Sequence, residues 1–258
     1  MTVRAKRELG QHFLVDENIL GVIGRLAELA PEDVVLEIGP GLGVLTTYLA
    51  DRVGHVCAVE LDRSLEPGLM QALAGRSNVE LVFGDALQLD LAALDPPPSK
   101  LVANLPYNVA TPLVVESLDR LPSLERWTVM VQREVADRFF AAPATKAYGA
   151  VSVLLQLTTE RTGFHPVSPS VFRPRPNVQS AIVAFRRRGV PEDYAAIKLV
   201  VGGAFAHRRK QLANSLELSG LATRAEETAA LAQIGREPTV RAEELAPDEL
   251  AALARALA

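Results

Sequence analysis

In the segment Val34-Val-Leu-Glu-Ile-Gly-Pro-Gly-Leu-Gly43, a short apolar run passes directly into a glycine-rich turn. The run predicts a buried strand, and the glycines permit the tight turn that leads into a helix over residues 44–53. Open parallel sheets bind ligands where such strands end, so this turn is the first candidate site in the chain. By itself the turn fits a dinucleotide, another nucleoside or a plain strand-to-helix connection.

The same pattern continues on both sides of this segment. Apolar runs that predict strands recur at residues 56–59, 79–83, 101–103 and 127–131. Helical spacing lies before and between them, at residues 16–29, 63–73 and 111–118. This alternation predicts an α/β fold with a doubly wound, mostly parallel, Rossmann-like sheet.

The later part of the chain changes character. A helix is predicted over residues 148–158, and a late strand over residues 180–185 is expected to be antiparallel and at the sheet edge. Gly189-Val-Pro191 then interrupts the pattern. The spacing beyond it is helical over residues 193–205, 208–216 and 246–257. We therefore predict an α/β domain with a basic N-terminal arm over residues 1–189 and a small helical domain over residues 190–258.

The composition is that of an ordinary globular protein, with 48% hydrophobic and 22% charged residues in 258. No apolar run reaches the roughly 18 residues of a membrane span, and the N-terminal segment lacks the apolar core of a secretory signal, so we expect a cytoplasmic protein without a membrane partner. Cys57 is the only cysteine, which excludes an internal disulfide and a multi-cysteine zinc site. The four histidines have no metal-ligand spacing, and no metal is expected.

Charge is distributed unevenly along the chain. The formal net charge is −4, but the basic segment, residues 161–216, carries 10 basic and 2 acidic side chains. Such a segment predicts a surface that binds a polyanion, although charge runs are also often only solvated.

Two later strand ends add carboxylates beside the glycine turn. Glu60 follows the second strand, where a carboxylate accepts hydrogen bonds from both hydroxyls of a ribose, and Asp85 follows the third, where it can accept from an adenine amino group. Singly, either acid is equally a helix cap or a solvated loop residue. Together they predict an adenosine-containing cofactor. Pro40 removes a backbone donor that a pyrophosphate would use, which favours S-adenosylmethionine over NAD.

Asn104-Leu-Pro-Tyr107 ends the fourth strand of this series. The side-chain carbonyl of Asn104 and the main-chain carbonyl of Leu105 can accept from the two N–H bonds of an exocyclic adenine amine, which is otherwise a poor nucleophile. Pro106 fixes the turn, and Tyr107 offers a ring on which a base can stack. Taken alone, the motif is also an ordinary loop after a strand. Beside the predicted cofactor, it predicts methylation of an adenine amine.

Several segments, in this order, closely resemble the small-subunit ribosomal RNA adenine dimethyltransferase family. They are Arg4–Asp16, Glu37–Gly43, Asn104–Tyr107, Met130–Arg138, Tyr148–Val153, Val171–Val178 and Phe205–Leu212. The resemblance covers about residues 4–216, and the acidic segment beyond residue 217 matches poorly and receives no role.

The resemblance implies a class I methyltransferase domain followed by a helical RNA-binding domain. It implies N6,N6-dimethylation of two adjacent adenosines in the 3′-terminal hairpin of small-subunit (16S) rRNA, within an immature 30S particle. S-adenosylmethionine would be the cofactor and S-adenosylhomocysteine the product. We expect the enzyme to be a monomer.

The resemblance also assigns residues. The cofactor would contact Gln11, His12, Leu14, Gly39, Gly41, Glu60, Leu61, Asp85, Ala86 and Asn104. The target base would be held by Asn104, Leu105, Pro106, Tyr107 and Phe172, with Phe172 stacking from an exposed loop stiffened by prolines. The family usually has asparagine where this chain has His12, and an imidazole can donate or accept with different geometry.

If the substrate is rRNA, the basic segment is expected to bind it. Arg173 and Arg175 flank Phe172, and His207, Arg208, Arg209 and Lys210 open a predicted helix, so both groups are expected to bind RNA phosphates. Arg186-Arg-Arg188 is equally well a solvated strand end.

Two other functions remain open on the sequence alone. One is methylation of a large-subunit rRNA adenine or of adenine in DNA. The other is a ribosome-assembly checkpoint, in which binding to immature subunits matters more than methylation.

Overall fold

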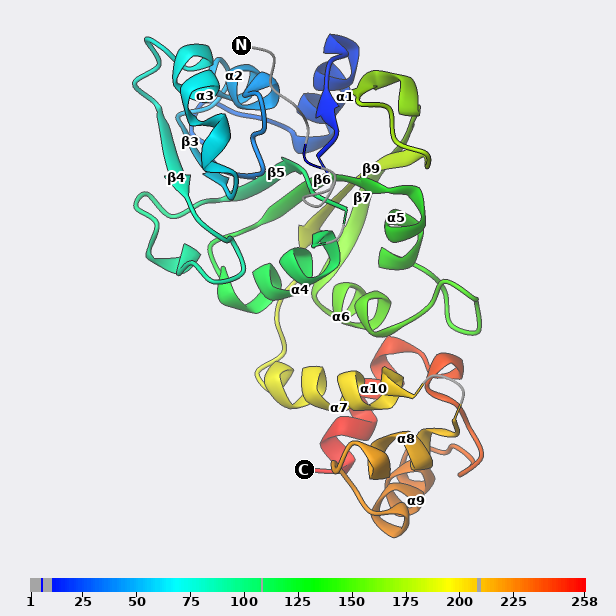
Figure 1. Ribbon diagram of the computed structural model, residues 1–258. Helices are drawn as coiled ribbons and strands as arrows, with labels where there is room; N and C mark the ends of the chain where they lie inside the picture. Colours follow the sequence, from blue (N-terminus) through cyan, green and yellow to red (C-terminus); the bar gives the residue numbers. More distant parts are fainter. Residues whose placement is uncertain (1–5, 7–10, 108, 208–209) are drawn as a thin grey trace. The chain divides into compact units, whose positions relative to one another are not determined.

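The computed structural model describes residues 6, 11–107, 109–207 and 210–258 (Figure 1). Its strands are β1 Phe13–Leu14, β2 Val34–Ile38, β3 His55–Glu60, β4 Val79–Phe83, β5 Lys100–Asn104, β6 Arg126–Gln132, β7 Thr159–Val167, β8 Phe172–Arg173 and β9 Ser180–Arg187. Its α-helices are α1 Glu17–Ala27, α2 Val44–Ala50, α3 Glu66–Ala72, α4 Ala110–Arg120, α5 Arg133–Phe139, α6 Ala150–Thr158, α7 Tyr194–Ala206, α8 Leu212–Leu218, α9 Arg224–Gln233 and α10 Pro247–Ala256. Short 3₁₀ turns are η2 Arg63–Leu65, η3 Leu91–Ala93, η4 Pro169–Val171 and η5 Ala242–Glu244.

Seven strands form one sheet in the order β4-β3-β2-β5-β6-β9-β7. β2 pairs in parallel with β3 and with β5, β3 with β4, and β5 with β6, whereas β9 runs antiparallel to β6. The predicted doubly wound, mostly parallel α/β fold is confirmed. Figure 1 shows α1, α2 and α3 on one face of the sheet and α4 on the other.

The late strand is not the edge strand that its sequence predicted. β9 is the second strand from the edge, and β7 lies outside it. Residues 180–185 of β9 are all buried, as expected for a strand with neighbours on both sides. β7 has the sequence Thr-Glu-Arg-Thr-Gly-Phe-His-Pro-Val, whose polar residues gave no hydrophobic pattern to detect.

The order of the strands creates a switch point between β2 and β5. After β2 the chain moves outward through β3 and β4, and then returns to place β5 and β6 on the other side of β2. The loops after β2 and β5 therefore leave in opposite directions, and a crevice opens between them. The glycine turn follows β2 and Asn104 ends β5, so the fold brings the two motifs to this crevice.

A separate two-stranded sheet holds residues near the N-terminus to the Phe172 loop. β1 pairs antiparallel with β8, with Phe13 opposite Arg173 and Leu14 opposite Phe172. The sequence patterns did not predict these two-residue strands.

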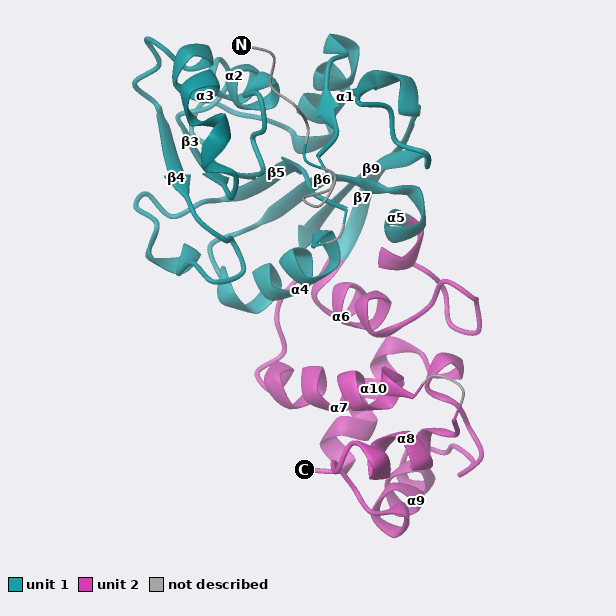
Figure 2. Cartoon of the chain, in the orientation of Figure 1, with its two compact units in different colours: residues 1–136, 160–187 teal, residues 137–159, 188–258 magenta. Residues whose placement is uncertain are grey.

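The chain divides into two compact units (Figure 2). Unit 1 comprises residues 1–136 and 160–187, and unit 2 comprises residues 137–159 and 188–258. The junction at residues 187 and 188 lies close to the boundary predicted near residue 189, but residues 137–159 group with the helical unit. The reason is packing, because α6 lies against α7 and α10 and the Tyr148 hydroxyl donates to the Leu245 carbonyl at 2.8 Å.

Candidate active site

The glycine turn after β2 depends on backbone conformations that suit glycine. Gly39, Gly41 and Gly43 have φ angles of 76°, 61° and 79°, in the left-handed region. A Cβ atom on Gly41 would lie 3.0 Å from the Phe13 ring, so a larger residue would push away the segment that begins with β1. The glycines thus allow the turn and β1 to lie close together.

Glu60 connects the end of β3 to this turn. Its carboxylate accepts from the Gly41 N–H at 3.1 Å and from the Asp62 N–H at 2.8 Å. Glu60 is buried, and this burial raises the pKa of its carboxyl, although the two backbone donors oppose the shift. The acid predicted for a ribose is therefore at the pocket, held by backbone groups on both sides.

Glu37 is a second buried acid in the pocket, and the sequence analysis did not select it. Burial raises the pKa of Glu37 to about 8, with the nearby Thr46 hydroxyl opposing the shift and the charge of Glu60 adding to it. Its Oε2 atom has no hydrogen-bond partner among the residues that the structure describes. The available signal was an acid inside the apolar run 34–38.

Hydrogen bonds fix the Asn104 motif after β5. The Asn104 side-chain N–H donates to the His12 carbonyl at 3.1 Å, and the Leu105 N–H donates to the Met130 carbonyl at 3.0 Å. The Tyr107 hydroxyl shares a 2.6 Å hydrogen bond with that of Ser180. Burial raises the pKa of Tyr107, so this hydroxyl stays neutral near pH 7.

The imidazole ring of His12 contacts Tyr107 in the pocket and Pro174 in the segment after β8. Its ring stacks on that of Tyr107 with a centroid distance of 5.4 Å, and its Nδ1 atom lies 2.8 Å from the Pro174 carbonyl. Because a carbonyl only accepts, Nδ1 carries the proton in this contact.

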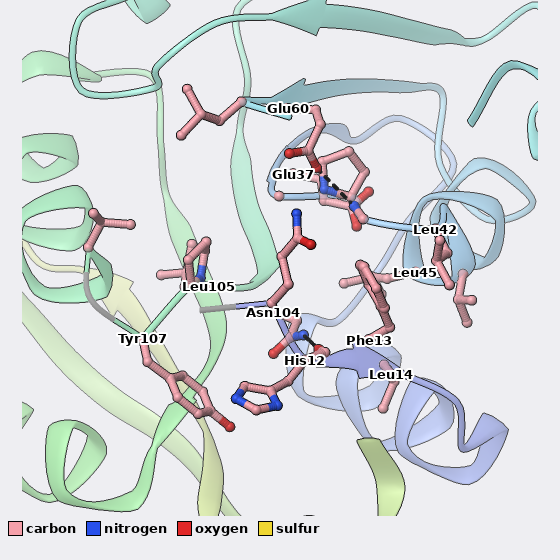
Figure 3. Close-up of a pocket in the computed structure, with 18 residues that line it drawn as sticks. His12, Phe13, Leu14, Glu37, Leu42, Leu45, Glu60, Asn104, Leu105 and Tyr107 are labelled. Carbon is pink, nitrogen blue, oxygen red and sulfur yellow. Dashed lines mark hydrogen bonds between the residues drawn. The ribbon is translucent and has the colours of Figure 1, made fainter. Parts of the chain in front are cut away.

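These groups surround one pocket in unit 1, in which Glu37 and Glu60 lie toward one end and His12 and Tyr107 toward the other (Figure 3). The predicted residues that line it are Gln11, His12, Leu14, Gly39, Gly41, Glu60, Leu61, Asn104, Leu105, Pro106 and Tyr107. The lining residues that were not predicted as site residues are Phe13, Glu37, Pro40, Leu42, Val44, Leu45 and Val109. Most of the additional residues are apolar neighbours of the motifs and have no chemical signature in the sequence.

Three of the residues predicted to contact the cofactor or the target base do not line this pocket. Asp85 is exposed beyond β4, where its carboxylate accepts from the Leu87 N–H at 2.9 Å, and Ala86 lines a smaller hollow beside η3 and α4. The expectation of an exposed Phe172 ring is wrong in this structure, because its exposed fraction is 0% and it packs in the hydrophobic core. The pairing of β1 with β8 places Leu14 opposite Phe172.

Some side chains of the basic segment are exposed, whereas others are bound within the fold. Arg173 and Arg175 are exposed in unit 1, and His207 and Lys210 are exposed in unit 2. Arg208 and Arg209 lie outside the described residues. Helix α8 begins at Leu212 rather than at the predicted residue 208, so His207 and Lys210 precede the helix.

Arg187 has a structural role instead. Its guanidinium donates to the carbonyls of Leu118, Leu121 and Leu124 at 2.8, 3.0 and 2.6 Å, and it lies over the Trp127 ring at 5.0 Å. Its neighbour Arg186 forms an ion pair with Glu160. Arg187 therefore stabilises unit 1 through hydrogen bonds to backbone carbonyls and is not a solvated strand end.

None of the helices in the described ranges combines the length and the hydropathy needed to cross a bilayer. Over the same ranges, His, Cys, Asp and Glu side chains form no group of three or more suited to a metal ion.

Comparisons with known proteins point to one family. The profile of the ribosomal RNA adenine dimethylase family matches residues 2–256. The ribosomal RNA small subunit methyltransferase A of Rubrobacter xylanophilus is 51% identical over 255 residues, which cover 98% of this chain and 95% of that protein. Its counterpart in Geobacter metallireducens is 42% identical over 99% of this chain and 96% of that protein. The match thus includes the segment beyond residue 217, which the sequence motifs had left unmatched.

Solved structures agree with this result. A dimethyladenosine transferase from Plasmodium falciparum has a TM-score of 0.75 over 94% of this chain and 96% of that chain, at 22% identity, and so supports the fold alone. The 23S rRNA methyltransferase ErmE has a TM-score of 0.67 and 30% identity, over 95% of this chain and 99% of that chain.

Proposed function

Because the chain belongs to the ribosomal RNA adenine dimethylase family, we propose that it converts two adjacent adenosines in the 3′-terminal hairpin of small-subunit (16S) rRNA to N6,N6-dimethyladenosine. The observation that carries the proposal is the single pocket in which Asn104-Leu-Pro-Tyr107 lies beside the glycine turn and Glu60. The substrate would be the rRNA within an immature 30S particle, and the enzyme would act as a monomer in the cytoplasm.

The residues in the pocket suit S-adenosylmethionine. This cofactor carries an ammonium group, and Glu37 offers a buried carboxyl oxygen that lacks a partner in the described part of the chain. Glu60 would hold the ribose, and Gly39 and Gly41 would let the methionine end approach the backbone. When bound, the cofactor supplies an electrophilic methyl group and leaves as S-adenosylhomocysteine.

The Asn104 motif would prepare the adenine amine. Since the Asn104 side-chain N–H donates to His12, its oxygen is the atom that remains to accept from the amine, together with the Leu105 carbonyl. Accepting both N–H bonds favours a pyramidal nitrogen with a more available lone pair. The Tyr107 ring would support the base, and its hydroxyl is held by Ser180. One amine proton leaves in each of the two rounds, after the new N–C bond has formed.

Neither alternative is favoured. The relatives named as small-subunit enzymes reach 51% identity, against 30% for ErmE. A checkpoint role based on binding alone would not require the ordered acceptors around Asn104.

The test is nucleoside mass spectrometry on small subunits that lack the modification, after incubation with the protein and S-adenosylmethionine. We expect N6,N6-dimethyladenosine in the 3′-terminal hairpin, and far less of it after the same incubation with an Asn104→Ala variant. Product in large-subunit rRNA instead, or no product from protein that binds the cofactor, would contradict the proposal.

A further inference from the structure

Asp62, two residues after the end of β3, is a second acid, and it binds the N-terminal arm. This arm is described by Lys6 and by residues 11–14. The Asp62 carboxylate accepts from the Lys6 ammonium at 2.6 Å and from the Gln11 side-chain N–H at 3.0 Å. It also accepts from the N–H and the hydroxyl of Ser64, at 3.0 and 2.6 Å. Asp62 is only 5% exposed and yet has four donors, two of which come from the arm.

The protonation of Asp62 agrees with this arrangement. Burial alone would raise the pKa of its carboxyl, but the hydrogen bonds from Lys6, Ser64 and Gln11 hold the pKa well below its usual range. The carboxylate is therefore charged near pH 7.

Gln11 joins this acid to the pocket. Gln11 is one of the residues that line the pocket, whereas Asp62 is not. Its side-chain carbonyl accepts from the Lys6 backbone N–H at 2.8 Å, and its own backbone N–H donates to the Lys6 carbonyl at 3.4 Å. Lys6 and Gln11 thus bind each other and bind the same carboxylate.

The next residues of the arm, His12 and Phe13, contact Asn104 and the glycine turn. The His12 carbonyl accepts from Asn104, and the Phe13 ring lies against Gly41. The contacts with Asp62 involve a charged carboxylate, whereas the contacts with Asn104 and Gly41 involve neutral groups.

We propose that Asp62 is a positioning residue for cofactor binding, which holds Gln11 and Lys6 so that the arm closes one side of the pocket. This role rests on the proposed cofactor site. It differs from that of Glu60, two residues earlier, which faces the pocket itself. The residues at and just after the end of β3 would therefore hold the glycine turn through Glu60 and the arm through Asp62.

Asp62→Asn, Lys6→Met and their combination test the proposal. Asparagine keeps one oxygen for Ser64 but loses the charge and the second acceptor. Lys6 is 41% exposed in its side chain, so Lys6→Met is a mild change that should leave folding intact. Asp51→Asn is the matched control, because it breaks an ion pair of 2.9 Å with Arg76 in the same unit without altering a residue of the pocket.

Calorimetry with S-adenosylmethionine gives the first measurement. Each single variant should bind about five- to tenfold more weakly than the wild type, as expected for loss of charge-assisted hydrogen bonds at a partly exposed site. The double variant should bind no more weakly than Asp62→Asn, and the control should be unchanged. Raising the salt from about 0.05 M to about 0.5 M should weaken the wild type toward Asp62→Asn. At saturating cofactor, kcat should change little while KM for the cofactor rises.

Amide hydrogen exchange at Gln11, measured without cofactor, reports on the attachment of the arm separately from cofactor binding. Faster exchange in Asp62→Asn and Lys6→Met would show that Asp62 holds the arm, and unchanged exchange would overturn the proposal. Faster exchange with unchanged cofactor affinity would also overturn it, since the arm would then not matter for binding. A wild-type protein that binds no S-adenosylmethionine would overturn the cofactor assignment, and the exchange result would still report on the arm by itself.

Discussion

Asn104 shows how one hydrogen bond decides which atom of a residue faces a substrate. An asparagine amide can present either its oxygen or its nitrogen, and here the nitrogen is occupied by the His12 carbonyl at 3.1 Å. The oxygen is then the atom available to the amine. A backbone contact of the arm thereby determines the chemistry offered by the strand end.

We expect Asn104→Ala to lower the methyl-transfer rate by about 10²- to 10³-fold, the usual cost of losing one preorganised polar group. Single-turnover kinetics on small subunits would measure this loss, and calorimetry should show cofactor affinity within a few-fold of the wild type. Asn18→Ala, at an exposed position on α1, is the matched control and should be neutral. A rate that stays near the wild type in Asn104→Ala would remove Asn104 from the reaction.

Glu37 should make the stability of the protein depend on pH. Its pKa is raised to about 8 in the folded protein from 4.5, so its contribution is fully present below about pH 4.5 and is lost as pH rises through 8. Glu37→Gln cannot ionise. The difference in Tm between the variant and the wild type should therefore grow from pH 5 to pH 8 and then level off. A constant difference across this range would show that the buried carboxyl does not titrate in this way.

At the scale of elements, the two-stranded sheet of β1 and β8 has the largest effect on the site. It brings Phe13 and Leu14 to the pocket, and it covers Phe172, which the family resemblance assigns to the target base. The loop before β9 was expected to expose this ring, but the ring has become part of the core of unit 1.

Phe172→Ala should therefore destabilise unit 1 by about 3–5 kcal/mol, the usual cost of removing a buried aromatic ring. Urea unfolding followed by the fluorescence of Trp127, which also lies in unit 1, would measure this cost. A near-zero cost would show that the ring is not packed as described. Phe172→Leu refills the core and is the variant for function. Methylation lost in that variant at unchanged stability would show that the ring acts on the base.

At the scale of the whole molecule, the basic segment is shared between the two units and between two roles. Arg173 and Arg175 belong to unit 1 and Lys210 to unit 2, and all three are exposed. Arg187, in the same segment, is used to tie α4 and the residues after it to the sheet. Clustered charge in the sequence therefore does not make every basic side chain available to RNA.

Arg173→Ala, Arg175→Ala and Lys210→Ala should each weaken RNA binding and reduce the slope of log K against log salt by about 0.7–0.9 per lost phosphate contact. Arg187→Ala should leave that slope unchanged and lower the Tm instead, because three carbonyls lose their donor. Filter binding over a salt series, together with thermal unfolding, distinguishes the two classes. A reduced slope in Arg187→Ala would place that side chain on the RNA.

The class of fold, the strands that carry the motifs and most of the pocket residues could be predicted from the amino-acid sequence. These features follow from local patterns, since apolar runs mark buried strands and glycines mark the turn that needs left-handed conformations. Asn104, Glu60 and Gly41 could be predicted because strand ends of a doubly wound sheet meet at one edge.

Which side chains are available at that edge depends on the three-dimensional packing. Phe172 is covered by β1, and Arg187 is bound by three carbonyls. One carboxyl oxygen of Glu37 lacks a hydrogen-bond partner among the described residues, and Asp62 is bound to Lys6, 56 positions earlier in the chain. Burial and hydrogen bonding between distant segments depend on packing, which no local pattern records. The same dependence explains why the polar strand β7 and the two-residue strand β1 were not predicted, because pairing with distant neighbours, rather than their own sequences, makes them strands.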